Sequence, residues 1–347
     1  MSRRKQGPST ELVLGPGLRR GTNSLRILVT GSSGWLGRFL APLLRVHGHR
    51  VTGLDVAPGA ETQILGSVAD RSLVDRAFAD HGIEAVIHAG ALHKPDIARH
   101  PAQAFVDTNV TGTLNLLEAA VAAGHDRFIF TSTTSLMITA EMRAGRGGGA
   151  RRAAWLDEGF GPLRPRNIYG VTKLAAERLC RLFRMDHGLA VAILRTSRFF
   201  PEDDDSESDP SGPNLKANEF LNRRLTVEDA AAAHVAALER APELGFDTFV
   251  LSAPPPFTPD ESPALIEDAP RVIARQFPDA AELYARAGWK LPRHIDRIYD
   301  PSHAERRLGF RCRTDFAAVL EALRRGSPLP FVHDPSYVSP AIAKGRG

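Results

Sequence analysis

The sequence contains very little cysteine. Its 347 residues include two cysteines, Cys180 and Cys312, which lie far apart in the chain. This usage excludes a disulfide framework and predicts a reducing, cytoplasmic setting. The 12 histidines form no H-x-x-x-H pair and no cluster with cysteine. We therefore expect no metal site.

Long hydrophobic runs are also missing. No apolar stretch reaches the roughly 18 residues that a membrane-spanning helix needs. Residues 1–24 carry scattered basic side chains with Gly and Pro, and they lack the apolar core of a secretory signal. We expect this segment to be a disordered tail, and we expect no membrane partner.

Positive charge is not concentrated in a stripe anywhere in the sequence, although residues 202–209 are strongly acidic. The formal net charge is +4, and the isoelectric point near 9.3 comes from arginines spread along the sequence. Proteins that bind nucleic acids carry a clustered basic stripe with interleaved aromatic residues. No such stripe is present, so the expected partner is a small molecule and not a nucleic acid.

Glycine, by contrast, recurs at regular intervals near the start of the chain. The apolar run 27–29 predicts a buried strand, and Gly31, Gly34 and Gly37 follow it before an amphipathic helix. The three glycines permit a tight turn, a close approach to a ligand, and close packing of helix on strand. Amide N–H groups at a helix start favour an anion. The pattern indicates a dinucleotide-binding turn with the spacing G-x-x-G-x-x-G.

An acidic residue ends the second predicted strand, residues 49–55. Asp55 lies roughly 20 residues beyond the turn, where a carboxylate accepts hydrogen bonds from the adenosine ribose of a dinucleotide. A carboxylate there repels the 2′-phosphate of NADP, so the sequence favours NAD. A turn aspartate without a ligand is the alternative.

Apolar runs and amphipathic segments alternate along most of the chain. This alternation predicts an α/β fold with a doubly wound parallel Rossmann sheet. The predicted strands are 25–30, 49–55, 63–67, 85–91, 127–132, 190–195 and 247–252, and the predicted helices are 35–46, 71–81, 101–123, one beginning near 168, and 229–240.

The change in composition after residue 196 predicts how the chain is divided. We expect a dinucleotide-binding domain over 25–198 with returning elements at about 225–252. A smaller C-terminal substrate-binding lobe is expected from 199–224 and 253–330. The last segment, 331–347, is rich in Pro, Ser and Gly and is expected to be a tail. The Gly- and Arg-rich stretch 143–152 is expected to be a flexible loop.

One pair of side chains indicates chemistry. Tyr169 and Lys173 are four residues apart on a predicted helix, so both project from one face. A tyrosine, whose ordinary pKa is about 10, needs a nearby positive charge to act as an acid or base near neutral pH. Lys173 supplies that charge, and the hydroxyl cluster 131–135 follows a predicted strand and can orient a substrate oxygen. Together with the glycine turn, the pair predicts a hydride-transfer site.

These features resemble the extended short-chain dehydrogenase/reductase superfamily, in its NAD-dependent epimerase/dehydratase family, and within it the nucleotide-sugar 4-epimerases. The resemblance covers about residues 25–325. It is carried by the glycine turn, Asp55, His88-Ala89-Gly90-Ala91, Asn109-x-x-Gly112-Thr113, Phe130-Thr131-Ser132-Thr133, the run from Tyr169 to Glu177, and Arg195.

The resemblance implies a role for each matching residue. Tyr169 would be the catalytic acid and base, Lys173 would lower its pKa and hold the nicotinamide ribose, and Thr133 would be the catalytic hydroxyl. The positions expected to bind NAD share the turn and the strand ends beside it: Gly31, Ser33, Gly34, Trp35, Leu36, Gly37, Asp55, Ser67, Val68, Ala89, Gly90, Ala91, Asn109, Ser132, Tyr169 and Lys173.

Substrate contacts are expected from His93, Thr133, Arg198, Arg293 and Asp296. An arginine three residues before an aspartate, as at 293–296, resembles the nucleotide-diphosphate site of the epimerases, but it also fits a surface ion pair. His93, beside Lys94, fits either an anionic substrate or an ordinary loop. Arg198 stands where the family has an asparagine, and it could bind a phosphate or carboxylate or face the solvent.

Two further departures from the family pattern bear on function. Ser67 stands where the family carries an adenine-binding aspartate. Thr134-Ser135 replaces the Asp-Glu pair of the sugar-nucleotide 4,6-dehydratases, which argues against dehydration. The resemblance favours an NAD-dependent epimerase or oxidoreductase acting on a nucleotide-sugar. A dehydrogenase or reductase of another small alcohol or carbonyl compound is the alternative. The resemblance also implies a homodimer formed by helices 101–123 and 168–185.

Overall fold

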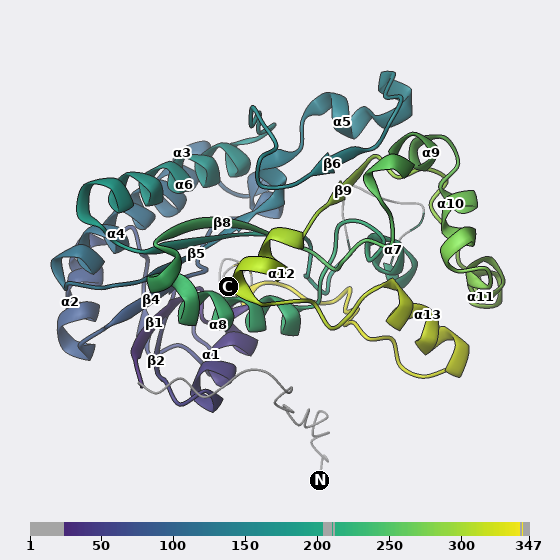
Figure 1. Ribbon diagram of the computed structural model, residues 1–347. Helices are drawn as coiled ribbons and strands as arrows, with labels where there is room; N and C mark the ends of the chain where they lie inside the picture. Colours follow the sequence, from purple (N-terminus) through teal and green to yellow (C-terminus); the bar gives the residue numbers. More distant parts are fainter. Residues whose placement is uncertain (1–23, 204–209, 211, 341, 343–347) are drawn as a thin grey trace, which may run out of the picture.

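A computed structural model describes residues 24–203, 210, 212–340 and 342. The predicted tail at residues 1–24 therefore lies outside the described residues, apart from Ser24. Within the described part, seven parallel strands form one sheet in the order β3-β2-β1-β4-β5-β7-β8 (Figure 1). The strands are β1 Arg26–Thr30, β2 Arg50–Asp55, β3 Ile64–Leu65, β4 Ala85–His88, β5 Phe128–Thr133, β7 Val191–Thr196 and β8 Phe246–Leu251. The doubly wound parallel sheet predicted from the sequence is confirmed.

The strand order reverses between β1 and β4. Ile27 of β1 pairs with Val51 of β2 on one side and with Ala85 of β4 on the other. In open α/β sheets a ligand binds beyond the carboxyl ends of the strands at such a reversal. The topology therefore places a binding crevice beside the glycine turn, which directly follows β1.

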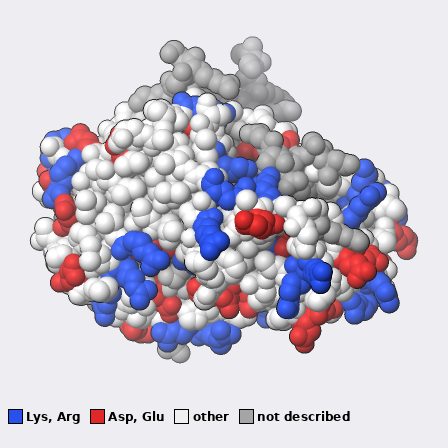
Figure 2. All heavy atoms as spheres, turned by 90° about the horizontal axis from the view of Figure 1, so that it is seen from above, with Lys and Arg blue, Asp and Glu red and all other residues white. Residues whose placement is uncertain are grey.

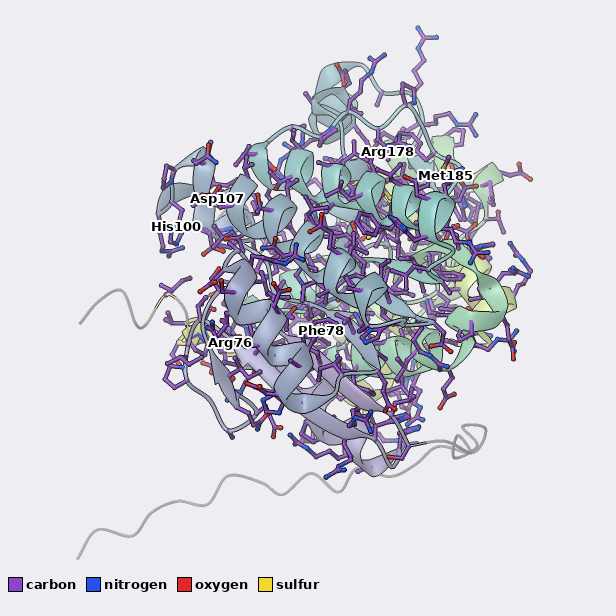
Figure 3. The ribbon with its side chains drawn as sticks, turned by 90° about the vertical axis from the view of Figure 1, so that its left-hand side faces the viewer. Arg76, Phe78, His100, Asp107, Arg178 and Met185 are labelled. Carbon is purple, nitrogen blue, oxygen red and sulfur yellow. The ribbon has the colours of Figure 1, made fainter. Side chains whose placement is uncertain are left out.

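Helices cover both faces of the sheet, and alternate strand residues face each layer. Ile27 and Val29 pack with α1 (Gly37–Val46) and α8 (Val227–Leu244). Leu28, between them, packs toward the opposite layer. That layer, seen from its outer side in Figure 3, consists of α2 (Arg71–His81), α4 (Gly112–Ala122) and α6 (Ile168–His187). Both faces are buried at the centre of the sheet, which is why β1 and β4 contain continuous apolar runs.

The predicted helix 101–123 has three parts. It begins with the short α3 (Ala102–Phe105), continues through a π-helical segment, Val106–Thr111, and ends as α4. A π-helical segment widens the helix locally and often lies at a functional site. Here it carries the buried Asn109.

The C-terminal helices build a separate hydrophobic cluster beside the sheet. Phe220, Leu265, Val272, Tyr284 and Phe316 are buried in it. The helices concerned are α7 (Gly212–Glu219), α9 (Ser262–Glu267), α10 (Ala269–Gln276), α11 (Ala280–Arg286) and α13 (Phe316–Arg325), while α12 (Ser302–Leu308) packs on β8 and α8. Among the described helices, none combines the length and apolar character needed to cross a membrane.

A two-stranded parallel sheet connects this cluster to the chain between β5 and α6. Its strands are β6 (Ala154–Leu156) and β9 (Arg297–Tyr299). The sequence did not predict it, because each strand has three residues and its partner is distant in the chain. The stretch 143–152, expected to be a flexible loop, is partly helical instead. It contains the end of α5 (Ala140–Ala144) and a 3-10 turn at 145–148. The Thr139 hydroxyl oxygen stabilises the start of α5 by accepting a hydrogen bond from the Met142 amide.

Charged side chains are interspersed on the face of the molecule seen from above. Figure 2 shows Lys and Arg in several separate groups, with acidic and uncharged side chains between them. This distribution agrees with the scattered arginines of the sequence.

Candidate active site

A cavity of about 840 Å³ opens at the carboxyl ends of the central strands. Its wall includes the glycine turn after β1, the strand ends of β2, β4, β5 and β7, and the start of α6. Most of the residues expected to bind cofactor or substrate line it: Gly31, Gly34, Trp35, Leu36, Asp55, Ser67, Val68, Ala89, Gly90, Ala91, His93, Ser132, Thr133, Tyr169, Lys173 and Arg198. Ser33, Gly37, Asn109, Arg293 and Asp296 are not part of this lining.

The glycine turn is packed too tightly for side chains at two positions. Gly31 has a φ of +72°, and a Cβ there would lie 2.8 Å from the Gly90 amide nitrogen. A Cβ on Gly37 would lie 2.3 Å from the Gly31 carbonyl oxygen. Both distances are shorter than van der Waals contact. Gly37 therefore serves the site indirectly, by bringing α1 against the turn.

Helix α1 begins without a side-chain cap. Leu36 occupies its N-cap position, and its first turn contains no acidic residue. The dipole at such a helix start favours an anion, while the Arg38 and Phe39 amides donate to the Gly34 and Leu36 carbonyl oxygens. Trp35 and Leu36 bring this helix start to the cavity wall. The start of α1 fits a phosphate group.

Asp55 lies at the end of β2, beside the turn, and its side chain is held in place on both oxygens. One oxygen accepts from the Ser33 amide at 3.0 Å and the other from the Ala57 amide at 2.9 Å. Burial raises the pKa of Asp55, while these amide hydrogen bonds act against the rise. Each carboxylate oxygen has a second lone pair, which can accept from a ribose hydroxyl. Ser33 does not line the cavity itself, and it contributes to the site by orienting Asp55.

The two strand ends on either side of β1 supply small, fixed backbone. After β3, the side-chain Nδ2 of Asn115 donates to the Val68 and Ala69 carbonyl oxygens at 3.0 and 3.2 Å. These bonds fix the segment that includes Ser67. After β4, the Gly90 amide donates to Thr30 Oγ1 at 3.0 Å. This bond turns Ala89–Ala91 away from the sheet ladder. The predicted strand 85–91 therefore ends at 88.

Asn109 holds the loop after β4 against α6. Its Oδ1 accepts from the Leu92 amide at 2.9 Å, and its Nδ2 donates to the Leu92 carbonyl oxygen and to Thr172 Oγ1, both at 3.1 Å. These bonds position His93 on one side and the first turn of α6 on the other. Asn109 can therefore stabilise the wall of the cofactor site without itself contacting a ligand.

The three predicted catalytic residues meet at one end of the cavity. Tyr169 and Lys173 lie on the first turns of α6, whose start is capped by Asn167 accepting from the Gly170 amide. Thr133 ends β5 and accepts from the Ser135 amide at 3.1 Å. The Lys173 ammonium lies 3.9 Å from the centre of the Phe130 ring. All three side chains are less than 10% exposed.

Burial controls the titration of these groups. It raises the pKa of Tyr169 to about 12, and a hydrogen bond with Thr133 acts against the rise. It lowers the pKa of Lys173 to about 7, while the charge of Glu177 acts in the opposite direction. Without ligands, Tyr169 is therefore protonated at neutral pH and Lys173 is near the midpoint of its titration. A cation beside Tyr169 would lower its pKa toward the working range.

A buried ion pair lies beside the predicted catalytic residues. Arg195 on β7 donates to both oxygens of Glu177 on α6, at 3.0 and 2.7 Å, and the Ser132 hydroxyl donates to Glu177 at 2.6 Å. Ser132 was expected beside the nicotinamide. It lines the cavity, but its hydroxyl is turned to this pair. The pair joins α6 to β5 and β7, so it fixes the spacing between Tyr169 and Thr133.

Three arginines that come from separate elements converge on the cavity wall. Arg143 lies on α5, Arg166 precedes α6, and Arg297 lies on β9. Partial burial lowers the pKa of Arg166, and the charges of Arg143 and Arg297 lower it further. Arg297 is already paired with Asp296, so an anion bound here would chiefly relieve the repulsion that acts on Arg166. None of the three was among the predicted site residues.

The predicted pair Arg293 and Asp296 is not brought to the cavity. Arg293 is exposed, and Asp296 forms an ion pair with Arg297. The short strand β9 explains the displacement: its pairing with β6 carries Arg297 to the wall. The arginine of this segment that lines the cavity is therefore Arg297, four residues after the predicted Arg293.

His93 and Arg198 reach the cavity in ways that the sequence did not show. The His93 ring packs edge-on against Tyr169, with ring centres 5.7 Å apart, and burial lowers its pKa to about 4. A neutral imidazole can donate a hydrogen bond to a substrate but does not attract an anion by charge. The Nε atom of Arg198 lies 3.4 Å from Oε1 of Glu219. That pairing partly neutralises the charge Arg198 presents to the cavity.

Comparison with known proteins identifies the family. The family described as NAD dependent epimerase/dehydratase matches residues 27–213, which is more than half of the chain. The chain belongs to this family.

Individual relatives of this epimerase/dehydratase-family chain are more distant. A UDP-glucose 4-epimerase of Azospirillum brasilense is 30% identical over 181 residues, covering 50% of this chain and 48% of that enzyme. An L-arabinose 1-dehydrogenase (NAD(P)(+)) of Haloferax volcanii is 32% identical over 223 residues, covering 62% of this chain and 78% of that enzyme. The chain thus spans about half the length of the first of these curated relatives.

A solved structure extends the likeness over most of the chain. It is a short-chain dehydrogenase/reductase superfamily protein from Agrobacterium tumefaciens with bound NAD, at 25% identity and a TM-score of 0.60, covering 87% of this chain and 97% of that one. This likeness agrees with membership of the short-chain dehydrogenase/reductase superfamily, and the family that matches the chain is described as NAD dependent.

The residues present fit NAD. The uncapped start of α1 suits the pyrophosphate, the Asp55 carboxylate suits the adenosine ribose, and the small residues at 89–91 leave room beside β4. Tyr169, Lys173 and Thr133 stand at the opposite side of the same cavity, where a nicotinamide and a substrate would meet.

Proposed function

We propose that this chain is an NAD-dependent epimerase that acts on a nucleotide-sugar. One observation carries the proposal: a single cavity is lined both by Tyr169, Lys173 and Thr133 and by converging arginines. The first group suits a proton and hydride exchange at a sugar hydroxyl. The second suits the phosphates of the same substrate.

Tyr169 is proposed to move the proton. Its phenolate form takes the proton from a sugar hydroxyl as the carbon is oxidised, and the resulting phenol returns the proton when the keto group is reduced on the other face. Bound NAD supplies the acceptor and donor of the hydride. Thr133, hydrogen-bonded with Tyr169, holds the sugar oxygen in line. Protonated Lys173 favours the phenolate electrostatically.

Arg143, Arg166 and Arg297 are proposed to bind the diphosphate. A guanidinium offers a planar fork of donors that matches phosphate oxygens. An anion placed among these groups would chiefly relieve the repulsion that acts on Arg166, which gives the site a preference for a polyanionic substrate. Binding energy from this part of the substrate would also orient the sugar at Tyr169.

Dehydration is disfavoured by the side chains after Thr133. Elimination of water needs an acid and a base near the departing hydroxyl, and Thr134-Ser135 offers only hydroxyls. The Thr134 hydroxyl also donates to the Thr196 carbonyl oxygen at 3.3 Å.

A net dehydrogenase of a simpler sugar or other small alcohol is the second candidate. The likeness to an L-arabinose 1-dehydrogenase supports it, since that enzyme is matched over 78% of its length. Arg198, in place of the family's asparagine, also supports it, because a guanidinium suits a carboxylate as well as a phosphate. In this case NAD would exchange at each turnover.

A panel of UDP- and dTDP-sugars and free sugars distinguishes the two candidates. For an epimerase, one nucleotide-sugar should raise the melting temperature, and its epimer should appear by NMR without net NADH. For a dehydrogenase, NADH should accumulate with a free sugar. Tyr169→Phe should lose either activity by about a hundredfold or more while keeping its affinity for NAD. Unchanged turnover in this variant would contradict both candidates.

The anion site has a test of its own, in which one arginine serves as the control for another. Arg166→Met should raise the KM for the nucleotide-sugar by about tenfold or more, with a smaller effect on NAD binding. Arg293→Met, outside the cavity lining, should leave KM within about twofold. The opposite ranking would show that the pair at 293–296 binds the substrate, as its resemblance to the epimerases implies.

We further propose a homodimer formed through α4 and α6, located in the cytoplasm. Val171, Leu182 and Met185 on α6 are 48%, 46% and 73% exposed and share one face of the helix with Arg178, as Figure 3 shows for Arg178 and Met185. The two free cysteines are buried, which agrees with a reducing setting. Light scattering should give twice the chain mass, and Met185→Asp should shift it toward one chain mass.

A further inference from the structure

The segment 335–340, close to the C-terminus, forms part of the cavity wall. Pro335, Tyr337, Val338, Ser339 and Pro340 all line the cavity. Figure 1 shows this last part of the chain, in yellow, running from α13 back toward the sheet. Composition alone assigned it to a tail. No motif in the sequence predicts that this segment contacts the side of the cavity that fits the cofactor.

The start of this segment is fixed by hydrogen bonds. The Asp334 amide donates to the Pro201 carbonyl oxygen at 2.9 Å, in the chain that follows β7. Asp334 Oδ1 in turn accepts from the Ser336 amide and hydroxyl at 3.0 and 2.6 Å, which fixes the turn that precedes Tyr337. His333, just before it, lies 2.9 Å from the Lys216 ammonium. The segment is thus held in one course across the cavity.

Tyr337 contacts the glycine turn directly. Its ring meets the Trp35 ring edge to face, with centres 5.1 Å apart and planes at 65°. Trp35 itself packs on Phe39 of α1, and the Arg38 guanidinium lies over the Trp35 ring at 5.8 Å. The Tyr337 hydroxyl is hydrogen-bonded with Arg38, and the charge of Asp55 acts on it. Tyr337 therefore lies at the side of the cavity that fits the pyrophosphate and adenosine ribose.

We propose that residues 335–340 form the outer wall of the NAD site and that Tyr337, packed on Trp35, contacts the adenosine side of NAD and slows its release. The inference rests on NAD as the cofactor and is independent of the substrate. An aromatic ring on the turn covers ligand atoms that would otherwise face water.

The test measures NADH binding and release, with no need for turnover. Energy transfer from tryptophan to bound NADH gives the affinity, and chasing NADH with excess NAD in a stopped-flow instrument gives the release rate. Truncation after Asp334 and Tyr337→Ala should each raise the release rate by about 3- to 10-fold, the range expected for the loss of one aromatic contact. Tyr337→Phe retains the ring and should stay within about threefold of the parent chain.

Two matched controls distinguish the loss of this wall contact from a general destabilisation of the protein. Val332 precedes the segment, is 42% exposed and is not part of the cavity lining, so Val332→Ala should not change the release rate. Truncation after Ile342 should also leave it unchanged. Release rates that stay the same in both the Asp334 truncation and Tyr337→Ala overturn the proposal. Tighter NADH binding after truncation also overturns it, because the segment would then compete with the cofactor.

Discussion

Lys173→Met should stabilise the nucleotide-free protein while removing its hydride-transfer activity. The Lys173 side chain is buried on α6, with its ammonium 3.9 Å from the Phe130 ring centre. Burial lowers its pKa from 10.5 to about 7. Folding therefore costs free energy at any pH where the unfolded lysine carries a proton. A methionine fills a similar volume without that cost.

The pKa difference sets the size of the effect. It corresponds to at most roughly 5 kcal/mol, at 1.36 kcal/mol per pKa unit. The cation–π contact with Phe130 and local relaxation reduce this figure, so we expect the variant to gain about 1 to 3 kcal/mol near pH 6. The pKa is lowered by folding, so the unfolded chain binds more protons between about pH 7 and 10.5. The parent protein should therefore gain stability as pH rises through that window, by at most about 1.4 kcal/mol per pH unit.

Chemical denaturation of both proteins between about pH 6 and pH 9, after removal of bound nucleotide, measures the prediction. The advantage of Lys173→Met should be largest near pH 6 and should shrink by roughly 2 to 3 kcal/mol by pH 9 at the upper limit. The exposed Lys290 provides the control, because Lys290→Met should show no such trend. A difference that is constant with pH, or that grows toward pH 9, would refute the reasoning.

Three other substitutions test separate parts of the site. Gly37→Ala should lower the free energy of unfolding by at least about 2 kcal/mol, because its Cβ would lie 2.3 Å from a backbone oxygen of the turn, whereas Gly147→Ala enters open space and should be nearly neutral. Asp55→Asn should weaken NAD binding and reduce the preference for NAD over NADP by about tenfold. A titration that finds the same ratio of affinities would contradict the role of the carboxylate. Glu177→Gln leaves the buried Arg195 uncompensated and should cost about 3 kcal/mol by denaturation. Adding Arg195→Met should recover part of that loss, and a purely additive double variant would argue against a coupled pair.

Local patterns in the sequence predicted the sheet and the catalytic end of the cavity. The strand, glycine turn and helix at 26–46 are consecutive, so their spacing alone determines that Gly31 and Gly37 meet. Tyr169 and Lys173 share a helix face because they are four residues apart. The periodicity of a helix or strand carries this kind of information directly.

The substrate side was less predictable because distant segments form it. Arg143 and Arg297 approach each other only after β6 pairs with β9, two strands of three residues each. Such short strands have no reliable signature in the sequence, and nothing local indicates that Arg297 and not Arg293 reaches the cavity. The burial of Tyr337 on Trp35 is a similar case. A polar, proline-rich end of a chain resembles a tail until the surface that receives it is known.

The order of the segments along the chain also bears on when each part of the site forms during synthesis. The glycine turn and β5 lie in the first 133 residues, and the sheet is complete at Leu251 with β8. Arg297 and Tyr337 follow only after the C-terminal helices have begun. Because domains fold as the chain emerges, at about 5–20 residues per second, the part of the cavity that fits NAD can form seconds before the proposed phosphate-binding arginines and the proposed outer wall are complete. A nascent chain could therefore bind NAD before it can bind its substrate. Bound NAD would then stabilise the partly synthesised protein by mass action.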